Sequence, residues 1–457
     1  MAQGVLRKPE KQIELLKQLT DEYPNSNYLD AAQYQLGKTF MNQNQSAYAL
    51  AYFNLVVESD KYNSFRKKAL MDISTIYYNN GKYEAALETS KQLVNENPNY
   101  TDSKGAIQLI ENIYTDLGDI ESYESYINTL AFMDVSDAAL DSLTYESAER
   151  FYMQSDCNAA IDKLGKYLDK FAQPIFTLEA NYYRGECLYK AGRTEEALTN
   201  FENVLALNYN SFTEPSVVKA AFINYNNKNF AAAKENYKLM KEVAEYPENK
   251  LAAAVGLMRT TYKLKEYPEA KSAAEIVLQI EKIKPSLREE AHFVMAKSYQ
   301  SIGERDSAII HFEYIVTSSQ SEKAAESQYN IAYMVYETGN LDSAEVEVFE
   351  LVNQTPSYEY WLAKGLILLS DVYREKGDAF QAKATLQSII ENYEGDESLL
   401  QEANEKLDAL VNEEKPAENL EETPMEIDMG NDSYDQLFEE ELPVEENLPN
   451  SNDENNE

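Results

Sequence analysis

A unit of about 37 residues recurs ten times along this chain, and this repetition limits its fold more than any other feature. Position 20 of the repeat is alanine in nine of the ten copies, and Tyr123 is the exception. A short repeat buries its apolar side chains only against its neighbours, so the chain is predicted to stack its repeats instead of forming separate globular domains. The repeats begin at Asp30, Lys67, Lys104, Asp141, Leu178, Glu214, Leu251, Glu289, Ala325 and Ala363.

Each repeat is predicted to form a helix, a turn and a second helix. Position 8 is glycine, alanine or serine in eight copies, with Glu111 and Met258 as exceptions. Two helices packed about 8–10 Å apart need small side chains where they cross, so positions 8 and 20 mark the crossing. Apolar residues at positions 7, 11, 24 and 27, such as Leu36 and Phe53, follow helical spacing around it. Glycine at position 15 in six copies indicates the end of the first helix.

This pattern resembles the tetratricopeptide repeat family, with a small residue at position 8, alanine at 20, a bulky residue at 24 and proline at 32 in two copies (Pro98 and Pro356). The resemblance covers about residues 1–412. It implies an all-α fold, a right-handed superhelical solenoid of about ten helix-turn-helix repeats, and a role in holding other proteins. The period exceeds the family's usual 34 residues, so we expect a different superhelical pitch.

A narrower resemblance concerns the segment EYPNSNYLDAAQYQLGKTF at residues 22–40, with an echo at residues 145–171. It is similar to tetratricopeptide repeat proteins of the bacterial cell envelope, of the outer-membrane-assembly lipoprotein and Tol-Pal coordinator type. This resemblance implies a periplasmic or outer-membrane-associated location for the full-length protein, with a cytoplasmic location as the alternative. Cys157 and Cys187 leave the compartment open, because we interpret them as isolated buried thiols, with a bridge between neighbouring repeats as the alternative.

The two ends of the chain differ from the repeats at residues 30–399. Residues 1–29 are predicted to be a truncated half repeat, a second helix without its partner, so we expect the chain to be the C-terminal part of a longer protein. Residues 400–412 are predicted to form a capping helix. Residues 413–457 contain 17 acidic residues and one lysine, which predicts an acidic disordered tail. Its segment 433–442 holds clustered bulky residues, which either fold on a partner or belong to a solubilising brush.

The charge and the hydropathy pattern exclude two classes of partner. The formal net charge is -38, and no basic stripe is present that could neutralise phosphates, so nucleic acid is not an expected partner. No stretch approaches 18 consecutive apolar residues, so no direct membrane insertion of this chain is expected. A protein or peptide partner remains, and self-association through the half repeat is a further possibility.

The candidate binding surface follows from the periodicity of the first helix. Positions 2, 5, 9 and 12 share one helical face, which in a two-helix solenoid lines the concave side. This face is rich in tyrosine, which offers apolar area, a hydroxyl group and few rotatable bonds. The competing interpretation is that tyrosine is common at positions 5 and 12 across the family, whatever the ligand. The predicted peptide-binding residues are Tyr34, Tyr78, Tyr145, Tyr152, Tyr182, Tyr189, Tyr225, Tyr262, Phe293, Tyr329, Tyr333 and Tyr336.

Catalysis is not predicted. The chain contains two histidines, His292 and His311, which we interpret as core or surface residues because neither has a cysteine or histidine at ligand spacing. No phosphate loop, dinucleotide fingerprint, zincin motif or nucleophile elbow is present in the sequence. We therefore expect a non-enzymatic scaffold for protein–protein interaction without cofactor or metal. The alternatives are a structural spacer or self-assembly module, and a regulatory appendage of a longer protein.

Overall fold

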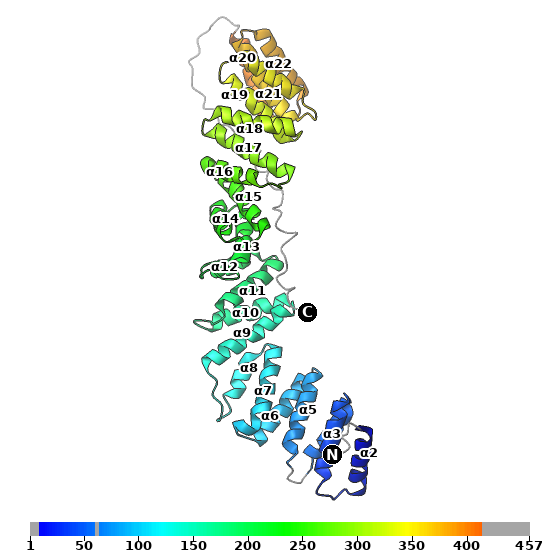
Figure 1. Ribbon diagram of the computed structural model, residues 1–457. Coiled ribbons are helices and arrows are strands. Elements are labelled where there is room, and N and C mark those ends of the chain that lie inside the picture. The colour runs from blue at the N-terminus through cyan, green and yellow to red at the C-terminus, as the bar shows by residue number, and fades with distance from the viewer. Residues whose placement is uncertain (1–8, 60–63, 414–457) are drawn as a thin grey trace. The chain divides into compact units, whose positions relative to one another are not determined.

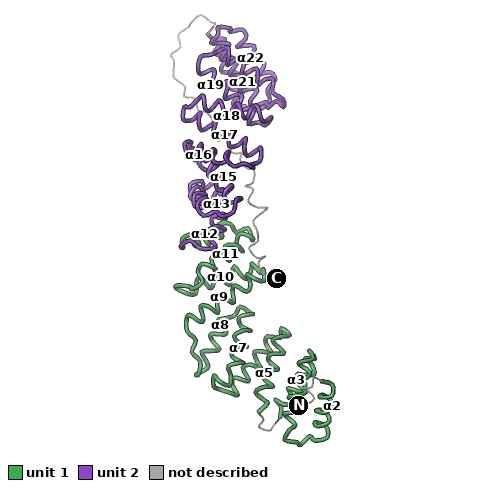
Figure 2. Tube along the Cα trace, viewed as in Figure 1, with its two compact units in different colours: residues 1–207 green, residues 208–457 purple. Residues whose placement is uncertain are grey.

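The computed structural model describes residues 9–59 and 64–413, and every regular element within them is an α-helix (Figure 1). The chain divides into two compact units, Met1–Leu207 and Asn208–Glu457, which we describe separately (Figure 2). In both units, consecutive helices pack against each other as hairpins. The predicted all-α fold of repeated helical hairpins is confirmed.

The first unit contains five hairpins, preceded by α2. In each hairpin the odd-numbered helix is the first helix of a repeat and the even-numbered helix is the second. The helices are α2 (Pro9–Glu22), α3 (Leu29–Asn42), α4 (Ser46–Val57), α5 (Arg66–Asn79), α6 (Tyr83–Glu96), α7 (Tyr100–Leu117), α8 (Ile120–Ile127), α9 (Asp137–Met153), α10 (Cys157–Lys170), α11 (Thr177–Lys190) and α12 (Thr194–Leu205).

The second unit contains five further hairpins, followed by α23. Odd-numbered helices are again the first helices. The helices are α13 (Thr213–Asn226), α14 (Phe230–Val243), α15 (Pro247–Lys263), α16 (Tyr267–Gln279), α17 (Pro285–Ser301), α18 (Arg305–Ser318), α19 (Glu322–Tyr336), α20 (Leu341–Val352), α21 (Glu359–Glu375), α22 (Ala379–Asn392) and α23 (Glu397–Glu413).

The small residues at positions 8 and 20 lie where the two helices of a repeat cross. Ala49, at position 20 of the first repeat, has no exposed surface. A methyl group added to Gly37, at position 8, would lie 2.5 Å from the ring of Phe53 at position 24. Any larger side chain at Gly37 would displace that ring, which fills the core beside the crossing. In the first repeat, the ring of Phe53 at position 24 therefore explains why position 8 is small.

The third repeat breaks the pattern at both positions, and the two exceptions contact each other. Tyr123, at position 20, is buried, and its hydroxyl group donates a hydrogen bond of 2.8 Å to Oε2 of Glu111, at position 8. The second helix of this repeat, α8, has eight residues, against 12 to 14 in the other second helices of the unit. A hydrogen-bonded pair of large residues thus replaces the small pair at this crossing.

Position 15 adopts a left-handed backbone conformation in all ten repeats. Six copies are the glycines expected from the sequence, with φ between 69° and 82°. The other four are Asn44, Ser155, Lys228 and Lys265, with φ between 58° and 62°. The turn between the helices fixes this conformation, so residues with a side chain adopt it at a cost of about 1–2 kcal/mol.

The helices at the two ends of the described chain are partly covered. Ile13 and Leu16 of α2 pack against the core of the first repeat, although no residue of α2 is fully buried. At the other end, α23 packs on α22 through Leu399, Ala403 and Leu410, and it begins three residues before the predicted start of the capping helix. Most of the predicted acidic tail, from residue 414 onward, lies outside the described residues.

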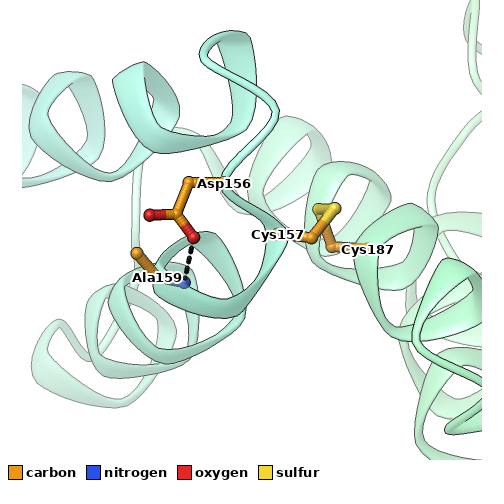
Figure 3. Close-up of a disulfide and its surroundings, with 4 residues drawn as sticks. All are labelled: Asp156, Cys157, Ala159 and Cys187. Atoms are coloured by element: carbon orange, nitrogen blue, oxygen red, sulfur yellow. Dashed lines mark hydrogen bonds between the residues drawn. A yellow bond between two sulfur atoms is a disulfide. The ribbon is translucent and has the colours of Figure 1, made fainter.

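The two cysteines form a disulfide bond, so their interpretation as isolated buried thiols is wrong. Cys157 begins α10 and Cys187 lies in α11, with their Cα atoms 5.0 Å apart (Figure 3). Asp156 caps α10 by accepting a hydrogen bond of 3.1 Å from the backbone N–H of Ala159, which fixes the start of that helix. The bond links the fourth repeat to the fifth, which is the alternative that the sequence left open.

Candidate protein-binding face

The candidate face consists of the exposed and half-buried side chains on the first helices, which we call the first-helix face. In the first unit, Tyr34 on α3 donates a hydrogen bond of 2.9 Å to Asp72 on α5. Lys38 donates to the other carboxylate oxygen of Asp72 at 3.0 Å. Burial, together with the negative charge of Asp72, raises the pKa of Tyr34. The hydroxyl group therefore remains a donor at neutral pH, and it links the first repeat to the second.

Asp116 on α7 connects three successive first helices. It accepts a hydrogen bond of 2.6 Å from Tyr78 on α5 and forms an ion pair with Arg150 on α9. The hydrogen bond to Asp116, with a further contribution from burial, raises the pKa of Tyr78 to about 12. Tyr78 is half-buried, so part of its ring remains available to a partner. The predicted contact residues Tyr34 and Tyr78 thus also hold neighbouring repeats together.

Three of the predicted contact residues belong to the core. Tyr145 is 4% exposed, Tyr182 is 9% exposed, and Phe293 has no exposed surface. The Tyr145 ring stacks on Phe176 at 4.3 Å, and Phe293 meets Phe312 edge to face at 6.3 Å. All three occupy position 5 of their repeats, which faces the second helix more than the periodicity suggested. These residues stabilise the fold and present almost no surface to a partner.

Other predicted residues are half-buried. Tyr152 stacks on Tyr183 with ring centroids 4.2 Å apart, and burial raises the pKa of Tyr152 to about 12. Tyr183 lies at position 6, outside the positions that the helical periodicity assigned to this face. Tyr189, Tyr225 and Tyr262 at position 12 are also half-buried.

In the second unit, ion pairs join successive first helices. Arg259 on α15 binds Glu290 on α17 through two hydrogen bonds, of 2.7 and 2.8 Å. Lys297 on α17 lies 3.3 Å from Glu326 on α19. These pairs join position 9 of one repeat to position 2 of the next. Two successive pairs of first helices, α15 with α17 and α17 with α19, are therefore joined by the same kind of ion pair, and we call these two pairs the charged ladder.

The ladder changes between α19 and α21. Position 9 is Tyr333 and position 2 of the next repeat is Lys364, with no carboxylate in an ion pair with Lys364 in the described chain. Instead, the Lys364 ammonium lies 5.4 Å from the ring centres of Tyr329, Tyr360 and Trp361. Burial lowers the pKa of Lys364, although nearby carboxylates oppose this effect. We call these five residues the Lys364 cluster.

The Lys364 cluster brings four aromatic side chains together around one lysine. The Tyr329 and Tyr333 rings stack at 6.2 Å, and Tyr360 meets Trp361 edge to face at 5.0 Å. Trp361 is 4% exposed, whereas both Tyr333 and Tyr360 are half-buried. The helical periodicity predicted the two tyrosines on α19 as contact residues, but it did not predict Tyr360, Trp361 or Lys364. Tyr336, one turn further along α19, donates a hydrogen bond to Glu375.

The two histidines, interpreted from the sequence as separate residues, contact each other in the structure. The Nδ1 atoms of His292 on α17 and His311 on α18 lie 2.9 Å apart, so one neutral ring can donate to the other. Burial, aided by His311 and Arg288, lowers the pKa of His292 to about 4. Within residues 9–59 and 64–413, no group of three or more His, Cys, Asp or Glu side chains is placed to hold a metal ion.

Among the helices in the described part of the chain, none combines the length and the apolar character that a transmembrane span requires.

Comparison with known protein families finds tetratricopeptide repeats in three segments. A family described as tetratricopeptide repeat-like domain matches residues 3–114. Families described as tetratricopeptide repeat match residues 178–211 and 365–395. The chain therefore carries tetratricopeptide repeats near its start, in its middle and near its end. No curated protein sequence matches the chain.

Several solved structures are similar to this chain. The structure of Naa15/Naa10 bound to HypK-THB is 12% identical, with a TM-score of 0.38, and the match covers 90% of this chain and 73% of that one. Yeast Tom70 is 13% identical, with a TM-score of 0.31 and coverage of 86% and 97%. The tetratricopeptide repeat domain of P58(IPK) is 15% identical, with a TM-score of 0.22 and coverage of 89% and 99%.

Proposed function

We propose that this protein is a non-enzymatic scaffold that binds a peptide or protein partner along its first-helix face. The observation that carries the proposal is the Lys364 cluster, where half-buried aromatic rings surround a lysine that has no ion-paired carboxylate in the described chain. Aromatic residues at such sites contribute large contact areas at a low entropic cost. The tetratricopeptide repeats found in three segments support a protein-binding role.

An extended peptide suits this face. The aromatic rings can pack against its apolar side chains, while the tyrosine hydroxyl groups and the Lys364 ammonium can donate hydrogen bonds to its carbonyl groups. Tyr34, Tyr78 and Tyr336 already donate to carboxylates of the next repeat, so they contribute ring surface more than free donors. The cluster residues Tyr333 and Tyr360 are the best candidates for direct contact.

The test is selection of peptides from a random 12-residue display library against the full chain, followed by affinity measurements with variants. We expect Tyr333→Ala with Tyr360→Ala to weaken the selected peptides about tenfold or more, as loss of a binding hot spot would. Tyr246→Ala is the matched control, because Tyr246 is 53% exposed and lies outside the cluster. Circular dichroism checks that each variant folds. Equal binding by the double variant would refute the proposed site.

We further propose that the protein functions in an oxidising compartment, such as the periplasm of a bacterial cell envelope. The disulfide between Cys157 and Cys187 supports this, because stable disulfides are rare in the reducing cytosol. The test is alkylation of unreduced protein taken directly from cells. Protection of both cysteines from the alkylating reagent is the expected result. Two free thiols would favour the cytoplasmic alternative.

Self-association is a second candidate function, favoured by the apolar surface of α2. Leu15 is 44% exposed, and no residue of this helix is fully buried. Pairing of α2 with a second copy would cover this surface. Sedimentation equilibrium of the full chain and of Leu15→Glu tests the idea. A monomer that persists at all concentrations would exclude it.

A further inference from the structure

A second candidate surface lies on the second helices of the repeats, where the residues at three exposed positions differ between the last three repeats and the others. Positions 18, 22 and 25 share one face of each second helix, because they are four and three residues apart. Across the ten repeats these positions hold polar or charged residues, glycine, alanine or proline, with four exceptions. The exceptions are Ile310, Val346, Phe349 and Phe380.

These four apolar residues lie on three successive second helices of the second unit, α18, α20 and α22 (Figure 1). The exposed fractions are 63% for Ile310, 57% for Val346, 43% for Phe349 and 79% for Phe380. Single exposed apolar residues are ordinary, but a group confined to one face of consecutive helices is typical of an interaction site. We call it the outward apolar face.

Charged residues around the outward apolar face are mostly acidic. The helices α18, α20 and α22 contain seven Asp and Glu residues but only two basic residues, Arg305 and Lys383. Arg305 already lies 3.2 Å from Glu337, whereas Lys376, just after α21, pairs with two of the seven carboxylates, Asp342 and Glu345 on α20. On α18, Asp306 and Glu313 occupy positions 18 and 25, on either side of Ile310 along the same helical face. The apolar residues are therefore bordered by carboxylates.

The carboxylates around the outward apolar face limit which partners can bind to it. A second copy pairing through the same face would bring carboxylates against carboxylates, and like charges across an interface are unfavourable. The acidic segment 433–442 and an anionic membrane surface are disfavoured for the same reason. A helix with one apolar face and lysine or arginine along its edges matches both the apolar residues and the border.

We propose that the outward apolar face docks a basic amphipathic helix of a partner protein. This binding site is separate from the first-helix face and requires none of the residues of the Lys364 cluster. The partner helix places apolar residues at i, i+3, i+4 and i+7 against Val346 and Phe349, and its basic residues face Asp306 and Glu313.

The probe is a fluorescein-labelled 18-residue helical peptide of leucine and lysine with leucine at that spacing, and its affinity is measured by anisotropy. A scrambled peptide of the same composition is the ligand control. We expect Val346→Ser with Phe349→Ser to weaken binding about tenfold or more. The matched control changes the same two positions of the sixth repeat, Glu235→Ser with Lys238→Ser, which leaves the net charge unchanged. This control is expected to change the affinity less than about twofold.

A second pair of substitutions tests whether the carboxylates around the face contribute to binding. Asp306→Asn with Glu313→Gln is expected to weaken binding several-fold at low salt and to reduce its salt dependence. Unchanged affinity in the serine variant, or equal binding of the scrambled peptide, would overturn the proposal. So would phosphatidylserine vesicle binding, or a dimer in sedimentation, that is lost in the serine variant. Tyr333→Ala with Tyr360→Ala should leave this binding intact, which separates it from the proposed function.

Discussion

Replacing Arg259 with methionine tests how strongly a buried ion pair holds α15 to α17. The side chains of Arg259 and Glu290 are 10% and 8% exposed, and two hydrogen bonds join them. Removing the guanidinium leaves a buried carboxylate without its counter-charge, which costs about 3–5 kcal/mol of unfolding free energy. The paired change Arg259→Met with Glu290→Leu removes both charges, and we expect its stability to lie within about 1 kcal/mol of the wild type.

The measurement is urea unfolding followed by circular dichroism, together with hydrogen exchange of peptides from α15 and α17. Hydrogen exchange is needed because repeat arrays lose cooperativity and one global transition does not report on one interface. Lys238→Met is the matched control, because the ion pair between Lys238 and Glu235 is solvent-exposed and is expected to contribute less than about 1 kcal/mol. A loss below about 1 kcal/mol in Arg259→Met, or equal losses in the single and paired variants, would refute the reasoning.

Three further predictions concern the disulfide, the histidine pair and a turn. Cys157→Ser with Cys187→Ser is expected to lower the unfolding free energy by about 3–4 kcal/mol, as chain entropy gives for a separation of 30 residues, measured by urea denaturation of the oxidised protein and the variant. The lowered pKa of His292 means that the unfolded chain binds more protons below pH 6.5, so stability should fall between pH 6.5 and about 4. Partial exposure limits the loss to about 1–2 kcal/mol, and His292→Asn with His311→Asn should flatten this part of a stability–pH profile. Lys265→Gly should raise the thermal midpoint of unfolding. Glycine adopts the left-handed conformation without strain, and after its larger loss of backbone entropy on folding the net gain in stability is about 0.5–1 kcal/mol.

The periodicity predicted the helical hairpins because a single physical constraint, the close approach of two helices, recurs at positions 8 and 20. It did not predict how the third repeat satisfies that constraint. Glu111 and Tyr123 each looked like a separate defect, although both occupy the crossing of the same repeat and could have been recognised as partners. The left-handed conformation of the four non-glycine residues at position 15, including Lys265, could not be predicted. The turn imposes this conformation although their side chains disfavour it.

The candidate face was predicted less completely than the fold. Helical spacing tells which residues share a face but not how deeply each is buried, so the core residues Tyr145 and Phe293 were grouped with more exposed tyrosines. The residues Tyr360 and Trp361 were missed for another reason. The repeat frame begins at Ala363, whereas α21 begins four residues earlier, so they fell outside the positions assigned to the first helix.

The first-helix face and the outward apolar face have different chemistry because they belong to different helices of the same repeats. On first helices, aromatic and charged side chains link each repeat to the next, so a substitution such as Tyr336→Phe removes a contact within the fold as well as surface available to a partner. On second helices, the side chains of Val346 and Phe349 are 57% and 43% exposed. Selection for binding can therefore change the outward apolar face with little loss of stability, whereas changes on the first-helix face alter both stability and recognition. This difference accounts for the recurrence of tyrosine on the first helices throughout the chain, whereas large apolar residues at positions 18, 22 and 25 of the second helices occur only in the last three repeats.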